Sequence, residues 1–169
     1  MPDASIVIRP VDTATDDEVV FVATRMRATL MEVLGAEQGA AMYELDWLVD
    51  RVRFHLDPER CTGAVFVADA DGEVVGHTIV RVEEDPEDPD VDATSVGLFS
   101  TTYVAPAGRR RGVADLLLGR GEDWMRAQGQ AVAITYTDPD NEPLIALYRE
   151  RGYDLAAAGD DFVRLSRPL

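Results

Sequence analysis

The chain has 169 residues, of which 46% are hydrophobic and 28% charged, a composition typical of a folded domain rather than a disordered or fibrous chain. We therefore expect one domain over residues 1–169. The 16 basic residues, all arginine, face 32 acidic ones, and the net charge of −16 opposes binding to nucleic acid or to anionic membranes. One cysteine, Cys61, excludes an internal disulfide, and two histidines argue against a metal centre.

The same features indicate a compartment. We see no basic segment followed by an apolar one near the N-terminus, and no apolar run of the roughly 18 residues that a membrane span needs. A single cysteine fits a reducing environment. We therefore expect a cytoplasmic protein.

The N-terminal third predicts one strand and two helices. Ser5 to Arg9 is a short apolar strand. Thr15 to Glu18 has the spacing of a capping box, and apolar residues then follow at helical intervals until Gly35. A second apolar stripe predicts one helix from Met42 to Leu56.

The middle of the chain changes to the period of a strand. From Val74 to Val82 the even positions are mostly apolar, whereas the odd ones include His77 and Arg81, which predicts one buried face and one face that is polar or lines a site. An acidic, proline-broken loop follows from Glu83 to Asp92. The strands and turn of this region are predicted at Ala64–Ala68, Asp71-Gly72 (the turn), Val74–Val82 and Thr94–Val104.

The last third alternates helices and strands. A helix between the strand that ends at Val104 and the strand that starts at Ala131 implies a parallel pair, and hairpins on either side imply antiparallel pairs. We therefore predict a mixed α/β sheet with helices on both faces. The segments are a helix over Arg111–Gln128, a strand over Ala131–Thr137, a helix over Pro143–Gly152, and strands over Asp154–Ala157 and Phe162–Leu165.

The turn after Val104 has the composition of an anion site. A strand ends, a proline turns the chain, and a helix begins in a segment of small residues and three arginines, Arg109 to Arg111. The first N–H groups of a helix lack intrahelical partners and lie at the positive end of its dipole, so they bind phosphate readily. An arginine-rich, solvated helix start is the alternative. The patterns of dinucleotide folds and P-loops are absent, and a chain without lysine excludes a P-loop.

Two motifs give the chain a resemblance to the GNAT superfamily of N-acetyltransferases. Arg109-x-x-Gly112-x-Ala114 is similar to that family's [QR]-x-x-G-x-[GA] coenzyme A signature. The segment from Asn141 to Tyr153 resembles its N-x-x-[A]-x-x-L-Y-x-x-x-G-[FY] motif, with Leu144 where alanine is commoner. The order of elements is also the family's order.

The resemblance implies a sheet that splays open between the strands ending at Val104 and Thr137, with acetyl-CoA in the gap as cosubstrate. Tyr148 would protonate the departing sulfur after direct attack by an amine. Asn141 and Tyr148, seven residues apart, would share a helix face, although a buried core tyrosine is the alternative for Tyr148. The cofactor-binding residues that the resemblance implies are Thr102, Tyr103, Val104, Arg109, Arg110, Arg111, Gly112, Val113, Ala114 and Asn141.

No general base is evident in this sequence. Many family members place a glutamate on one of the two splayed strands, and here the strand Thr94–Val104 has no carboxylate. Glu83 and Asp138 are candidates to act through water, and His77 lies on the same strand face as Glu83. The base therefore stays unassigned.

The resemblance places the acceptor amine, on a small molecule or a peptide, near the first two helices, about Met26 to Leu56. Acids there favour a cationic acceptor, or are ordinary solvated acids of an acidic protein. A homodimer is common in the family. A non-catalytic acyl-CoA-binding regulatory module and a structural domain with chance motifs are the two competing interpretations. The acids in question are Glu32, Glu37, Glu44 and Asp46.

Overall fold

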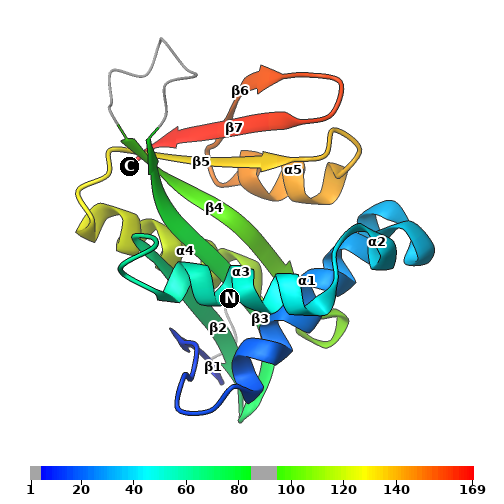
Figure 1. The fold of residues 1–169 in the computed structure, drawn as a ribbon. Helices are drawn as coiled ribbons and strands as arrows, with labels where there is room; N and C mark the ends of the chain where they lie inside the picture. The colour runs from blue at the N-terminus through cyan, green and yellow to red at the C-terminus, as the bar shows by residue number, and fades with distance from the viewer. Residues whose placement is uncertain (1–4, 85–94) are drawn as a thin grey trace.

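The computed structural model describes residues 5–84 and 95–169, which form a seven-stranded sheet of order β1-β2-β3-β4-β5-β7-β6 (Figure 1). Neighbouring strands are antiparallel, except that β4 and β5 run parallel. The strands are β1 (Ile6–Pro10), β2 (Gly63–Ala70), β3 (Glu73–Glu84), β4 (Ser95–Val104), β5 (Val132–Thr137), β6 (Asp154–Ala158) and β7 (Val163–Pro168).

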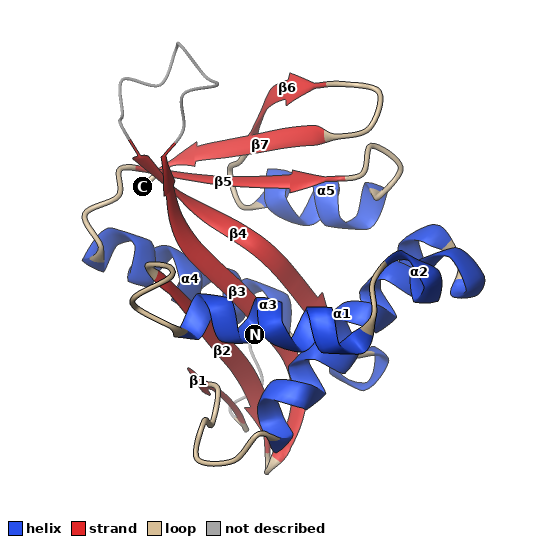
Figure 2. Ribbon diagram, viewed as in Figure 1, coloured by secondary structure: helices blue, strands red, loops and turns tan. Residues whose placement is uncertain are grey.

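Helices cover both faces of this sheet, as predicted (Figure 2). Helices α1 and α3 lie on one face, where Val22, Leu48 and Ile79 belong to one buried core. Helices α4 and α5 lie on the other, around a core that includes Phe99 and Tyr148. The helices are α1 (Asp17–Leu34), α2 (Ala36–Met42), α3 (Leu45–Leu56), α4 (Val113–Ala127) and α5 (Glu142–Glu150), with a 3₁₀ turn at Pro106–Gly108.

The predicted single helix from Met42 to Leu56 is wrong, because Met42 ends the short helix α2. Tyr43 and Glu44 are extended, and α3 begins at Leu45. The short helix folds back against α1 through Gly39, where an added Cβ would lie 2.4 Å from the backbone nitrogen of Met31. This close backbone contact requires glycine, and it turns the chain before α3 starts.

The predicted capping box does not form at the start of α1. Asp16 occupies the cap position without a side-chain hydrogen bond to the helix. Glu18 turns away to accept hydrogen bonds from Arg9 Nη1 at 2.7 Å and from the backbone N–H of Asp12 at 2.8 Å. An ion pair with β1 therefore replaces the local cap.

Strand β3 is buried on both faces from Val75 to Val80, so the prediction of one polar face is wrong for this stretch. Helices pack on both sides of the sheet, and His77 is only 1% exposed. The face becomes polar only at Arg81. Most of the predicted acidic loop, residues 85–92, lies outside the described residues.

The sheet opens between β4 and β5. Their parallel pairing covers only Gly97 to Phe99, opposite Ala133 to Thr135. Next along β4, Ser100 is an extra residue between Phe99 and Thr101 in the ladder with β3, which is a β-bulge. Beyond it no strand pairs with β4 on the β5 side within the described part of the chain. The predicted splayed mixed sheet is thus confirmed.

Residues 5–84 and 95–169 lack both a membrane-spanning helix and a cluster of metal ligands. No helix there combines the length and apolar character that crossing a membrane requires. No three histidine, cysteine, aspartate or glutamate side chains in those same ranges come together as potential metal ligands.

Candidate functional site

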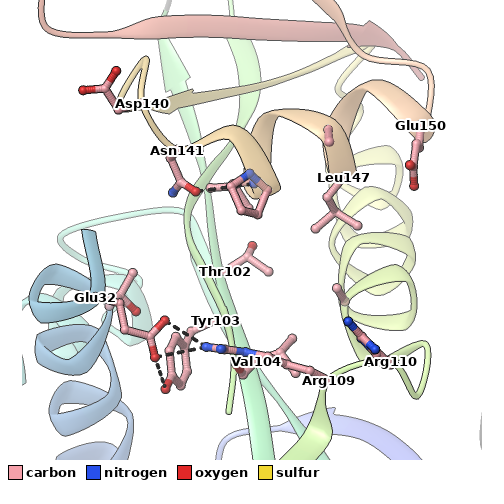
Figure 3. A pocket seen from close by; sticks show the side chains of 15 residues that line it. Glu32, Thr102, Tyr103, Val104, Arg109, Arg110, Asp140, Asn141, Leu147 and Glu150 are labelled. Atoms are coloured by element: carbon pink, nitrogen blue, oxygen red, sulfur yellow. Dashed lines mark hydrogen bonds and ion pairs between the residues drawn. The ribbon is translucent and has the colours of Figure 1, made fainter. Parts of the chain in front are cut away.

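A cleft of about 920 Å³ lies between the open edge of β4 and helix α5, and we call it the β4–α5 cleft (Figure 3). Helix α1 and the turn before α4 close its other sides. Seven of the predicted cofactor residues line it, and these are Thr102, Tyr103, Val104, Arg109, Arg110, Ala114 and Asn141.

The open edge of β4 supplies backbone groups to the cleft. Thr102 to Val104 pair with β3 on one side and with no described strand on the other. Unpaired edge N–H and C=O groups accept an extended amide-containing ligand in the way that they accept another strand. This edge is therefore suited to a linear molecule with amide bonds.

The start of α4 supplies N–H groups that no side chain caps. Gly112 is the cap residue, in the left-handed region with φ 77° and ψ 9°, and Arg110 also has a positive φ of 61°. Left-handed residues at the turn aim successive N–H groups to one side. An anion at the inner end of the cleft would meet these groups and the helix dipole.

Two predicted residues of this turn point elsewhere. The Val113 side chain is buried in a core cluster with Val75 and Leu117. Arg111 donates a hydrogen bond from Nη2 to Ser5 Oγ at 3.4 Å, and it is outside the cleft lining. Any contact of Val113 and Gly112 with a ligand is therefore through the backbone.

Arg109 spans the cleft to α1 (Figure 3). Its Nη2 donates to Glu32 Oε2 at 2.8 Å, its Nε donates to the carbonyl of Val104 at 3.0 Å, and the Tyr103 hydroxyl donates to Glu32 Oε1 at 3.3 Å. Both charged side chains are nearly half exposed, at 45% and 46%. An exposed pair of this kind is worth less than about 1 kcal/mol, so a ligand can break it at little cost.

Asn141 holds the start of α5 beside the cleft. Its Oδ1 accepts a hydrogen bond from the backbone N–H of Leu144 at 3.4 Å, which caps the helix. The cap uses only the side-chain oxygen of Asn141, and Asn141 also lines the cleft. Asn141 thus stabilises the start of α5 and is also available to contact a ligand in the cleft.

Tyr148 lies at the fork where β4 and β5 part, but its ring is in the core. The side chain is 1% exposed and packs edge-on against Phe99 and Tyr153. Its polar neighbours are Thr102 and Thr135, one on each of the parting strands. Burial raises the pKa of Tyr148 to about 12, and these two polar neighbours partly offset the rise.

A second cavity of about 520 Å³ adjoins the cleft, and we call it the α3 pocket. Thr29, Thr102, Asn141 and Leu144 line both spaces, so the two are continuous. Three aromatic residues are part of the pocket wall. Tyr43 stacks on Trp47 with ring centroids 4.3 Å apart, and Tyr136 of β5 also lines the pocket.

The charge of the α3 pocket contradicts the expectation of an acidic acceptor site. Glu37, Glu44 and Asp46 do not line it, and Glu32 belongs to the β4–α5 cleft. Its charged lining residues are Arg51, Arg81 and Asp138. The acids of this region point outward, as ordinary solvated acids do.

Sequence reasoning missed the basic residues of this pocket. Trp47, Arg51 and His55 are spaced four residues apart and so share one face of α3, which is the signal that could have indicated them. Arg81 follows Ile79 by two residues on β3, so it shares the face that α1 and α3 cover.

No histidine of the site is placed to act as a base near neutral pH. Burial lowers the pKa of His55 to about 4 and that of His77 to about 3. His55 Nε2 lies 3.1 Å from Arg81 Nη1, and His77 Nε2 lies 2.9 Å from Thr101 Oγ1. Glu83 is outside the pocket lining and pairs with Arg81 at 3.3 Å, whereas Asp138 lines the pocket.

Comparison with known proteins bears on what this site does. A family model described as "Acetyltransferase (GNAT) family" matches residues 26–153, whereas no curated protein sequence matches the chain. Among solved structures, the chain is similar to one in the NatC complex bound to Gag peptide and CoA, with a TM-score of 0.73, 16% identity, and coverage of 98% of this chain and 99% of that one.

Two bacterial structures are similar in the same way. One is yncA, a putative acetyltransferase from Salmonella typhimurium with its cofactor acetyl-CoA, at a TM-score of 0.71, 18% identity, and coverage of 98% and 94%. The other is ribosomal-protein-alanine N-acetyltransferase from Brucella melitensis, at 0.70, 20% identity, and coverage of 96% and 99%. At these identities the likeness concerns the fold.

Proposed function

Because this chain belongs to the acetyltransferase (GNAT) family, we propose that it transfers an acetyl group from acetyl-CoA to a primary amine, with the donor in the β4–α5 cleft and the amine in the α3 pocket. The observation that carries the proposal is the continuity of the two spaces at Thr102, Asn141 and Leu144. A donor and an acceptor that enter from opposite sides meet at that junction.

The cleft suits the donor on chemical grounds. The free β4 edge at Thr102 to Val104 matches the amides of a pantetheine arm, and the uncapped N-terminus of α4 matches a diphosphate. Acetyl-CoA supplies a thioester, whose carbonyl carbon the neutral amine attacks. The backbone N–H groups of the β4 edge are available to polarise the thioester carbonyl.

Tyr148 is the proposed proton donor to the departing sulfur. Its raised pKa keeps the proton on the hydroxyl throughout the neutral range, and the polar neighbour of that hydroxyl, Thr102, lines both spaces. The amine must lose one proton in the reaction, and the thiol of coenzyme A gains one. Asp138 is the one carboxylate among the residues that line the α3 pocket, and it is the candidate to relay the lost proton through water.

The experiment is release of coenzyme A from acetyl-CoA over a panel of amines and short peptides. Turnover with one class of amine, with the acetyl group found on nitrogen by mass spectrometry, is the expected result. Tight binding of acetyl-CoA with no release across the panel would favour a non-catalytic acyl-CoA-binding module. Absence of binding would reject both.

A further inference from the structure

The α3 pocket concentrates positive charge in a strongly acidic protein. Two of the 16 arginines line it together with the neutral His55, against one carboxylate, Asp138. A polypeptide with a net charge of −16 has many acids available to neutralise a guanidinium. Two arginines with one carboxylate in a small cavity point to an anionic group on the ligand that binds there.

Arg81 is held in place by a built network. Its Nη1 donates to His55 Nε2 at 3.1 Å and to Ser100 Oγ at 3.3 Å. The other ring nitrogen of His55, Nδ1, donates to the carbonyl of Arg51 at 2.7 Å, which fixes the tautomer that leaves Nε2 as an acceptor. Arg81 Nη2 donates to Oε1 of Glu83, which does not line the pocket.

Arg51 carries a charge that no described carboxylate pairs with. Its guanidinium lies over the ring of Phe54, 4.6 Å from the centroid, and 5.7 Å from that of Trp47. Cation–π contacts orient a guanidinium without neutralising it. Arg51 therefore offers its hydrogen-bond fork to a ligand in the pocket.

The opposite charge lies toward the cleft. Asp138 Oδ1 accepts a hydrogen bond at 2.8 Å from the backbone N–H of Asp140, which lines the cleft, and the next residue, Asn141, belongs to the junction of the two spaces. The pocket is thus acidic beside the position proposed for the amine and basic beside Ser100 and His55. The aromatic rings of Tyr43, Trp47 and Tyr136 line the same pocket.

We propose that the acceptor is a small amine that also carries a carboxylate, with an apolar or aromatic body between the two, and that Arg51 and Arg81 bind this carboxylate. The inference rests on the proposed function for the position of the amine. Ser100, which contacts Arg81, and the junction residue Thr102 are two residues apart on β4, about 7 Å. That span exceeds the one between the amine and the carboxylate of a free α-amino acid and fits a dipeptide.

The test compares glycyl-phenylalanine with its C-terminal amide as acceptors. The two differ in the carboxylate, which is remote from the amine. We expect the free acid to have a KM at least about tenfold lower, since an arginine–carboxylate hydrogen bond is charge-assisted. Arg51→Gln and Arg81→Gln should each reduce this ratio toward one. Arg51→Gln removes no hydrogen bond of the guanidinium among the described contacts, so it is the variant that tests the proposal if Arg81→Gln fails to fold.

Arg53→Gln is the matched control, because Arg53 is on the same helix, carries the same charge and pairs with Asp16 at the surface. It should leave the ratio unchanged. Equal KM values for acid and amide in the parent protein overturn the inference, as does an equal loss of discrimination in Arg53→Gln.

Calorimetric binding of both dipeptides in the presence of coenzyme A separates this inference from the proposed function. Preferential binding of the acid without any turnover supports the anion site while rejecting acetyl transfer to these amines. Turnover of both dipeptides with no preference for the acid supports acetyl transfer and rejects the anion site.

Discussion

Arg109 Nη2 and Glu32 Oε2 lie 2.8 Å apart and join the turn before α4 to helix α1 across the β4–α5 cleft. In this arrangement a carboxylate shares the cleft that the proposed function assigns to a ligand with several phosphate groups. Glu32 would repel those phosphates, and it holds the arginine that would attract them. Glu32 should therefore oppose binding of the donor and Arg109 should favour it, so substitutions at the two residues have opposite predicted effects.

Glu32→Gln should tighten acetyl-CoA binding by about three- to tenfold at low salt, because unit charges a few ångströms apart in water interact by about 1 kcal/mol. Arg109→Gln should weaken binding by a similar factor. Fluorescence or calorimetric titration measures both, and the effects should shrink at high salt. Glu37→Gln, which alters an exposed acid outside both spaces, serves as the control. Weaker binding in Glu32→Gln would show that the carboxylate assists the donor.

Gly112 offers a test of the diphosphate position. Its φ of 77° would strain a β-branched side chain, so a valine there would disturb folding itself. Asparagine tolerates the left-handed region and adds bulk above the first N–H groups of α4. In the parent, acetyl-CoA at 100 times its Kd should add about 2.7 kcal/mol of stability, whereas acetyl phosphate should add none.

Gly112→Asn should abolish most of the rise in Tm with acetyl-CoA. Gly129→Asn is the matched control, because Gly129 has the same φ of 77° at the other end of α4 with open space around it. That variant should keep the full shift. A full shift in Gly112→Asn as well would mean that no diphosphate approaches this turn.

Tyr148→Phe should lower kcat on the order of 10²-fold and leave acetyl-CoA affinity nearly unchanged, because it removes only the proposed proton donor. The pKa near 12 adds a second expectation. The parent should show no loss of kcat up to about pH 10, since the hydroxyl stays protonated there. Tyr153→Phe is the control, because the Tyr153 hydroxyl donates to Glu122 at 2.8 Å, away from the cleft. Parent-like turnover in Tyr148→Phe under chemistry-limited conditions would assign Tyr148 to the core alone.

The sequence predicted the sheet and the cleft more completely than it predicted the pocket. Period-two apolar segments and the turn at Asp71-Gly72 are local signals, and the motif around Arg109 and Gly112 is a continuous stretch. These features need no knowledge of the fold. Residues 102–104 followed from the resemblance, which places the cofactor along the strand that ends at Val104, a few residues before the motif.

The basic lining of the α3 pocket required information that local patterns do not contain. Arg51 and Arg81 are thirty positions apart and meet only because α3 packs across β3. The acids of the first helices left two interpretations open, an acidic acceptor site or ordinary solvated acids. Glu32 pairs with Arg109 and the other acids do not line the pocket, which favours the second interpretation. The number of charged residues in a sequence segment is thus a poor guide to the charge of a cavity that the segment helps to form.

The two histidines predict how stability depends on pH. Their pKa values in the folded protein, about 4 and about 3, lie below the value of about 6.5 for an unfolded chain. Below pH 6.5 the unfolded chain therefore binds protons that the folded protein does not. The free energy of unfolding consequently decreases as the pH is lowered. From pH 7 to pH 5 the loss should be about 2 kcal/mol for each histidine.

Denaturant unfolding at several pH values measures this loss. His55→Gln and His77→Gln should each halve the slope between pH 7 and pH 5, whatever they do to stability at pH 7. The range from pH 5 to pH 7 lies above the ordinary pKa of carboxyl groups, so the histidines dominate the change in stability there. A slope that neither variant changes would mean that both histidines titrate alike in the folded and unfolded states.

The pH dependence of acetyl transfer should follow the acceptor and not the protein. Neither histidine changes charge between pH 6 and pH 9, given their lowered pKa values, so neither produces a limb in that range. The attacking amine must be neutral, and an α-amine with a pKa near 7.7–8.0 has a far larger neutral fraction at pH 7 than a lysine-type amine near 10.4. We therefore expect kcat/KM to rise from pH 7 to pH 9 and low-pKa amines to be preferred.

The measurement is the profile of log kcat/KM for two acceptors of matched shape and different amine pKa. The midpoint of the rising limb should move with the amine. A midpoint common to both acceptors would instead reveal a base in the protein, and Asp138→Asn, rather than a change at Glu83 outside the pocket, would then be the variant expected to abolish the limb.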